Sequence, residues 1–338
     1  MDLNLIWFVL LGVLLAGYAV LDGFDLGVGM LHPWARGDDE RRTFIATIGP
    51  VWDGNEVWLV TFGGALFGAF PETYATVFSG FYIVFMLVLA ALITRAVSLD
   101  FRGKTESPAW RKTWDVGFCV SSAVATLLFG VGVGNAMIGV PLNARGIYVG
   151  GFFNLLNPYA ISVGLLAVTL FLMHGSIFLH LKTTGALKDR IYHWMWRTYG
   201  AFVAMYLIVS IATWFAVPRA VAPLREYPVA WLVVLVNVLA VLSIPLALRR
   251  HRSGGAFLAS CLATCALVLL LGLALFPNLV TSAPHPANSL TIYNAASSQK
   301  TLGIMLTIAI IGMPFVLAYT SIIYWVFRGR VSVGGEKA

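Results

Sequence analysis

The amino-acid sequence predicts an all-α fold, that of a polytopic integral membrane protein with nine transmembrane helices. Hydrophobic residues make up 59% of the 338 residues and charged residues only 11%, and the mean hydropathy is +0.85. This composition is far too apolar for a water-soluble domain. The apolar runs are continuous rather than alternating, and each can hold the roughly 20 residues that a helix needs to cross the hydrocarbon core. Membrane-spanning strands are therefore excluded.

Each predicted span is an apolar run bounded by polar residues. The first is expected to be a retained helix, because residues 1–4 lack the basic segment of a cleaved signal peptide. Pro158, directly after Asn157, is typical of a helix start and marks the beginning of the fifth span. No linker or low-complexity stretch divides the chain, so residues 1–338 are expected to form a single transmembrane domain. The nine helices are expected near residues 5–31, 43–70, 76–97, 115–139, 156–181, 198–217, 229–248, 256–276 and 302–327.

The distribution of basic residues predicts the orientation of the chain. Of the 22 Lys and Arg residues, 18 lie in every second connection and in the C-terminal segment, and the other connections hold 4. Because basic loops stay in the cytoplasm, the N-terminus is expected outside (periplasmic) and the C-terminus in the cytoplasm. The net charge of +7 is thereby explained without nucleic acid.

Small residues at intervals of four predict close contacts between helices. Gly64 and Gly68 form a G-x-x-x-G pattern, and glycines also recur at 129–135 in FGVGVGN. The three cysteines, Cys119, Cys261 and Cys265, all fall in apolar spans, and only the last two share a helix face. No further soft ligands lie near them in the sequence, so we expect them to pack and no metal site to form.

Four carboxylates are predicted inside the membrane. Asp22 and Asp25 lie on the first span and Asp53 and Glu56 on the second, each pair at an i, i+3 spacing that puts both acids on one face. At 1.5 Å per residue, Asp25, Asp22, Asp53 and Glu56 would lie about 9, 14, 15 and 20 Å from the inner ends of their helices. Four converging acids in a medium of low dielectric can pass protons along a ladder.

Two interpretations of these acids stay open at this stage. They can conduct protons, with Asp53 as the main proton-accepting site and the other three acids feeding or tuning it, since Pro50 loosens the helix and admits water. Alternatively, they can be structural groups that pair with Arg95 or with backbone amides.

The histidines give no pair of haem ligands. Of the six, only His174 lies well within a span, whereas a bis-histidine haem needs two deep imidazoles that face each other. We therefore expect no haem iron on this chain, and we interpret His174 as a hydrogen-bonded group between helices.

Several stretches resemble subunit II of the cytochrome bd-type quinol oxidases over nearly the whole chain. They include AVLDGFDLGVGML (19–31), the segment with WDGNEVWL (38–75), WRKTWDVGF (110–118) and ASSQKTLGIM (296–305). The resemblance implies an obligate heterodimer with a homologous subunit I that ligates two haem b and one haem d. Such a complex oxidises quinol, reduces oxygen to water and generates a membrane potential in the bacterial cytoplasmic (inner) membrane.

The resemblance also implies roles for particular residues. Asp53 and Asp25 match acids of the cytoplasmic proton path, and Trp58 matches a tryptophan near a lateral oxygen route, although an ordinary packed aromatic is an equal alternative. Glu56 and His174 depart from members that carry glutamine at these positions. A small accessory membrane subunit, and a bound quinone or structural lipid, are left open.

A function of another class is a proton- or sodium-coupled secondary transporter that uses the intramembrane acids. It predicts inverted repeats and a pair of corresponding broken helices. We find no convincing repeat of that kind in the sequence, so the oxidase subunit is the preferred hypothesis. A third hypothesis, a scaffold whose acids do not conduct, is not separable from the first by sequence.

Overall fold

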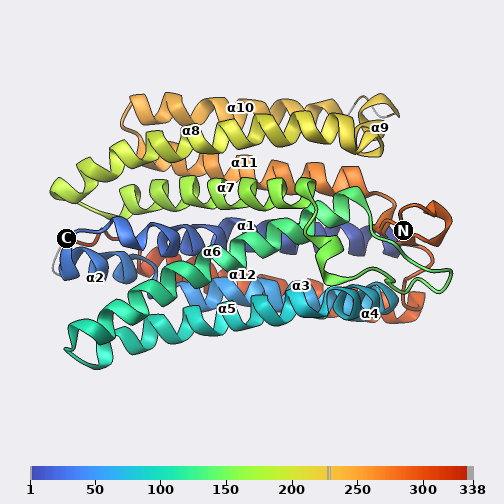
Figure 1. The fold of residues 1–338 in the computed structure, drawn as a ribbon, viewed down its shortest axis with the longest axis horizontal. Coiled ribbons are helices and arrows are strands. Elements are labelled where there is room, and N and C mark those ends of the chain that lie inside the picture. Colours follow the sequence, from blue (N-terminus) through green and yellow to red (C-terminus); the bar gives the residue numbers. More distant parts are fainter. Residues whose placement is uncertain (1, 227, 229, 333–338) are drawn as a thin grey trace.

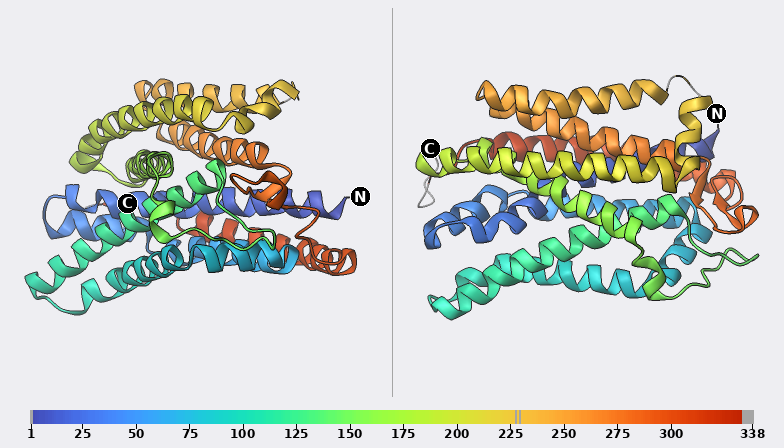
Figure 2. Two further views of the ribbon diagram at one scale, coloured as in Figure 1. Left: turned by 45° about the vertical axis from the view of Figure 1, so that its right-hand side comes forward. Right: turned by 45° about the horizontal axis from the view of Figure 1, so that its top comes forward.

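The structure is a computed structural model that describes residues 2–226, 228 and 230–332. As predicted, the fold is all-α: twelve α-helices in this part of the chain run roughly along one long axis (Figures 1 and 2). The start of helix α1 (Leu3–Leu31) and the end of helix α12 (Gln299–Val326) lie at opposite ends of the bundle (Figure 1). We call these the N-terminal end and the C-terminal end of the bundle.

Eight helices of the described residues are long and apolar enough to cross a membrane. They are α1 (Leu3–Leu31), α5 (Tyr82–Phe101), α6 (Pro108–Ile138), α7 (Pro158–Lys182), α8 (Gly185–Ala216), α10 (Ala230–Arg249), α11 (Ser253–Leu275) and α12 (Gln299–Val326). They correspond to eight of the nine predicted spans.

The second predicted span differs most from the prediction. Instead of one helix over 43–70, the chain forms α2 (Gly37–Ile48) and α3 (Trp52–Ala69), separated at residues 49–51. Pro50 lies in this break, where it lacks the backbone N–H that a continuous helix needs. Helix α3 alone has 18 residues, a length of about 27 Å, and it is not among the eight apolar spans.

The remaining elements lie between or beside the spans. Helix α4 (Pro71–Gly80) precedes α5, and α9 (Pro218–Glu226) connects α8 to α10. Four short 3-10 helices cover His32–Trp34, Arg102–Lys104, Phe152–Leu155 and Pro286–Asn288. Strands β1 (Asn278–Val280) and β2 (Leu290–Thr291) pair antiparallel in the connection between α11 and α12.

Glycine contacts set how closely the central helices approach. Gly27 of α1 lies against Gly175 of α7, and a Cβ added to Gly27 would be 2.0 Å from the Phe171 carbonyl oxygen. The close approach predicted at 129–135 is confirmed, because Gly130 and Gly134 contact the backbone of α7. At Gly64, by contrast, no other helix of the described residues lies within 4 Å of a Cβ placed there.

Candidate functional site

Asp22 forms an ion pair with Arg95 in the middle of the bundle. Asp22 points from α1 and Arg95 from α5, and both side chains are fully buried. Two nitrogens of the guanidinium donate to the two carboxylate oxygens at 2.9 and 2.5 Å. For Asp22, pairing with Arg95 is therefore confirmed. Such a buried pair is stable only while both partners are present.

Asp25 lies one helical turn further along α1 and has no cation of its own. It is also fully buried. One carboxylate oxygen, Oδ2, accepts a hydrogen bond of 2.7 Å from the Asn55 side-chain amide on α3. The other, Oδ1, has no hydrogen-bond partner among the described residues. The bundle thus contains a carboxyl group that is only half satisfied, which is uncommon at a purely structural position.

Asn55 is held in one orientation by a second helix. Its side-chain oxygen accepts a hydrogen bond of 2.9 Å from the Tyr324 hydroxyl of α12, and its amide also donates to the Leu21 carbonyl at 3.3 Å. Because the oxygen of Asn55 is bound to Tyr324, the NH₂ group faces Asp25. Three helices therefore position the environment of one carboxyl group.

The acids of α3 lie closer to the surface of the chain than those of α1. Asp53, in the first turn of α3, is exposed, and Glu56 is half-buried. Asn55, which lies between these two acids on α3, contacts Asp25, so the first turn of α3 lies beside the acids of α1. Because α3 begins only at Trp52, Asp53 lies at a helix end and not inside a continuous span as predicted.

Trp58 is packed between helices. Its ring lies against Gly17 of α1 so closely that a Cβ at Gly17 would be 2.3 Å from the ring carbon Cε3. The side chain is partly buried. This contact joins α3 to α1 two residues beyond Glu56.

His174 is a hydrogen-bonded group between helices, as we interpreted it. Its Nε2 lies 2.9 Å from the Val20 carbonyl oxygen, and its Nδ1 lies 2.8 Å from the Ser260 hydroxyl. A carbonyl can only accept, so Nε2 carries the proton of the neutral ring, and the single proton of the Ser260 hydroxyl is shared between Nδ1 and the Phe257 carbonyl, which lies 2.8 Å away. The ring also stacks on Phe257 with a centroid distance of 5.1 Å.

The other buried histidines do not fit haem either. His32 Nε2 is 2.6 Å from Asp115, and His180 Nδ1 is 2.9 Å from Ser253. Among the described residues, no group of three or more His, Cys, Asp or Glu side chains is arranged to hold a metal ion. His32, His174 and His180 each use at least one ring nitrogen in a hydrogen bond to a protein group.

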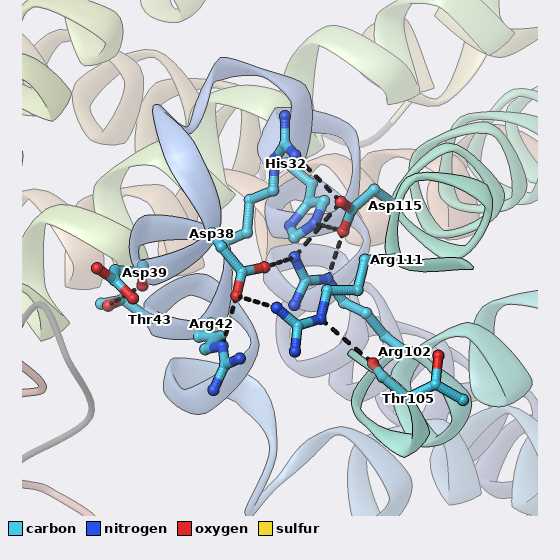
Figure 3. Close-up of polar contacts among 10 residues, drawn as sticks. His32, Asp38, Asp39, Arg42, Thr43, Arg102, Thr105, Arg111 and Asp115 are labelled. Atoms are coloured by element: carbon cyan, nitrogen blue, oxygen red, sulfur yellow. Dashed lines mark hydrogen bonds and ion pairs between the residues drawn. The ribbon is translucent and has the colours of Figure 1, made fainter. Parts of the chain in front are cut away.

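A second polar group lies toward the C-terminal end of the bundle, and Figure 3 shows its side chains. Asp115 of α6 faces His32, Arg41 and Arg102, with Arg102 Nε at 2.5 Å from Oδ1 and Arg41 at 3.2 Å from Oδ2. The carboxylate of Asp38, on α2, accepts hydrogen bonds from the guanidinium groups of Arg102 at 2.6 Å, Arg42 at 2.7 Å and Arg111 at 3.0 Å. We call these residues the end cluster: His32, Asp38, Arg41, Arg42, Arg102, Arg111 and Asp115.

Each carboxylate of the end cluster is paired with more than one cation. All four carboxylate oxygens of Asp38 and Asp115 have cationic partners. Partial burial by itself raises the pKa of Asp38, but hydrogen bonds from Arg102 and Arg42 outweigh it and hold the pKa below its usual value. These contacts fasten α2 to the ends of α5 and α6, so the cluster is a structural clamp.

Sequence reasoning did not identify Asn55, Tyr324 or the end cluster as part of a site. Asn55 stood inside the WDGN motif and Asp115 inside WRKTWDVGF, so both were in segments that had been singled out. The role of Tyr324 could not be predicted, because its partner Asn55 is 269 residues away in the sequence.

Comparison with known proteins identifies the family. The model of the family described as "Cytochrome bd terminal oxidase subunit II" matches residues 3–327. The chain is 38% identical to the cytochrome bd-I ubiquinol oxidase subunit 2 of Escherichia coli K12, over 98% of this chain and 95% of that protein. It is 35% identical to the cytochrome bd ubiquinol oxidase subunit 2 of Bacillus subtilis 168, over 98% and 97% of the two chains.

A solved structure has the same fold. A chain of the bd oxidase from Geobacillus thermodenitrificans aligns with a TM-score of 0.80 at 21% identity, over 97% of this chain and 99% of that chain. The chain therefore belongs to the cytochrome bd terminal oxidase subunit II family.

Proposed function

We propose that this chain is the haem-free subunit of a terminal oxidase in the bacterial cytoplasmic membrane. The complex would couple quinol oxidation to the reduction of oxygen to water and generate a membrane potential. Membership of the family and the names of its relatives support this proposal. The two haem b and one haem d would be held by subunit I and would supply the electron transfer and oxygen chemistry, because the histidines of this chain are engaged in other contacts.

The exposed face of α3 is the surface that we propose for subunit I. Val57, Val60, Gly64 and Phe67 are all exposed on it, and so is Asp53. A carboxylate that faces lipid is costly, whereas a partner helix could cover the acid and approach Gly64 closely. An obligate heterodimer accounts for both features.

Within this chain we propose a proton path that runs through Asp53, Glu56 and Asp25. Asp53 would accept the proton at the exposed start of α3, as the main proton-accepting site, and the half-buried Glu56 would pass it inward. Asp25 would take it on Oδ1, the oxygen with no partner; this is the observation that carries the proposal. Asp22 would keep its charge, since two hydrogen bonds hold it to Arg95, and would tune the path electrostatically.

Three further assignments rest on the family alone. Trp58 is proposed beside the oxygen route, although its packing on Gly17 is equally an ordinary helix contact. A small accessory membrane subunit and a bound quinone or structural lipid are also proposed as partners of the complex. The alternative, a proton- or sodium-coupled secondary transporter, is not favoured, because the relatives are oxidase subunits.

The test is proton uptake during single-turnover oxygen reduction by the purified complex. Asp53→Asn and Asp25→Asn preserve shape but cannot release a proton, so uptake should fall at least tenfold while the haem spectrum persists. Asp53→Glu should retain part of the function. The matched control is Asp39→Asn, which neutralises an exposed acid of α2 and should leave uptake unchanged.

Unchanged uptake in assembled Asp53→Asn and Asp25→Asn enzymes would reject the conducting role. The acids would then be pairing groups of a scaffold. A purified chain that is colourless and transports ions alone would instead reject the oxidase assignment.

A further inference from the structure

Helix α10 marks the position of the bilayer on one side of the molecule. It has 20 residues, a length of about 30 Å, which equals the thickness of the hydrocarbon core. Leu232, Leu235, Leu239, Leu242 and Leu246 are exposed along it, as expected of a lipid-facing helix. Its last residue, Arg249, therefore lies at the level of the lipid head groups.

The neighbouring helix α8 places another arginine at the same level. The guanidinium of Arg249 lies 6.0 Å from the centroid of the Trp196 ring on α8. From Arg197 to the end of α8 there are again 20 residues, about 30 Å. The first twelve residues of α8 extend beyond the end of α10 (Figure 1). This part of α8 therefore lies beyond the hydrocarbon core, next to the lipid head groups.

Four arginines share this level without a protein counterion. Arg197, Arg249, Arg250 and Arg252 are all exposed. Within the described residues no carboxylate lies within 4 Å of their guanidinium groups, whereas every arginine of the end cluster is paired. We call these four residues the arginine platform.

The turn that carries the arginine platform is held rigidly. His251, between the arginines, stacks on Tyr192 of α8 with a centroid distance of 4.9 Å. Ser253, directly after them, is 2.9 Å from His180 of α7, and the Arg252 N–H donates to the Ala247 carbonyl at 3.0 Å. Fixed cations lose less conformational freedom when a ligand binds.

We propose that the arginine platform binds the head group of an anionic phospholipid. Its phosphate oxygens would accept hydrogen bonds from the guanidinium groups, which suit phosphate because they donate in pairs. The acyl chains would lie along the exposed leucines of α10. This inference is independent of the proposed proton path and of the oxidase activity.

The test measures lipid binding to the purified, delipidated complex. Fluorescent phosphatidylglycerol, which is anionic, should bind more tightly than phosphatidylcholine, which is zwitterionic. The variant R249Q/R250Q/R252Q should lose about fivefold in phosphatidylglycerol affinity for each arginine removed. Binding should also weaken as salt is raised. Phosphatidylcholine affinity should fall much less, because its choline group cancels the charge of its phosphate.

The control removes the same charge from the opposite end of the bundle. Arg145, Arg225 and Lys300 are exposed there, so R145Q/R225Q/K300Q should keep the wild-type affinity. Equal binding of the two lipids, or an equal loss in both variants, would overturn the proposal. If the triple variant folds poorly, R250Q and R252Q singly carry the test, because neither guanidinium contacts a described carboxylate.

Discussion

The carboxylates of α1 and those of the end cluster differ in how many cations they are paired with. In the end cluster, two carboxylates face four arginines and a histidine, and every carboxylate oxygen has a cationic partner. On α1, two fully buried carboxylates share one arginine, and Asp22 takes both of its hydrogen bonds. Asp25 is left with one oxygen that has no partner.

This difference distinguishes carboxylates that only hold helices together from a carboxylate that can exchange a proton. A buried carboxylate that is paired on both oxygens is held in one charge state and serves packing. A buried carboxylate that is half satisfied can take up and release a proton, because neither state is locked by its neighbours. The substitutions below test this difference, from the largest expected effect to the smallest.

The largest effect is expected from Arg95→Gln, which leaves Asp22 charged, buried and without a cation. We expect the assembled complex to lose about 3–5 kcal/mol of stability, seen as a lower thermal unfolding midpoint. The double variant Arg95→Gln with Asp22→Asn removes both charges and should recover most of the loss. A single variant as stable as the double would contradict the role of the ion pair.

The second substitution, Asp115→Asn, tests the end cluster. It leaves His32, Arg41 and Arg102 with a neutral partner, and we expect a loss of about 1–3 kcal/mol in stability. Proton uptake should not change, because this cluster clamps helices and is not part of the proposed path. Asp39→Asn, a neighbouring exposed acid, is the stability control. A selective loss of proton uptake in assembled Asp115→Asn enzyme would show that the clamp conducts.

Tyr324→Phe sharpens the comparison at Asp25. It removes the hydroxyl that holds the Asn55 amide, so the amide can turn and Asp25 loses a fixed donor. We expect a stability cost of about 1 kcal/mol and a shift in the pH profile of proton uptake. Tyr319→Phe alters an exposed tyrosine of the same helix and should leave the profile as it is. Identical profiles for the two variants would mean that Tyr324 has no influence on Asp25.

The smallest effect concerns the pH dependence of α2. The pKa of Asp38 is lowered in the folded state by Arg102 and Arg42. Its contribution to stability is therefore complete above the unfolded pKa of about 3.9 and is lost as pH falls below it. The protection of α2 amides against hydrogen exchange, taken relative to the intrinsic exchange rate at each pH, should fall below about pH 4. Asp38→Asn should abolish this change, and persistence of the change in that variant would assign it to another acid.

The sequence determined the all-α class, the existence of eight of the spans and the presence of acids in the first of them, although α8 begins at Gly185, 13 residues before the predicted start. It could do so because a long apolar run in lipid has one way to satisfy its backbone, and because an acid within such a run is costly wherever it points. The DGFD and WDGN motifs also gave the family. The position of His174 between helices followed from its depth alone.

Only the tertiary structure decided which acid is paired, which is exposed and where the second span breaks. Arg95 and Asp22 are 73 residues apart in the sequence, and Tyr324 and Asn55 are 269 apart. Neither contact can be predicted from the spacing of residues within one helix. The i, i+3 pattern put Asp22 and Asp25 on one face but could not say that a single arginine would satisfy only the first. The physical reason is that pairing depends on which helices pack side by side, and packing is settled by contacts such as Gly27 against Gly175, which no single helix encodes.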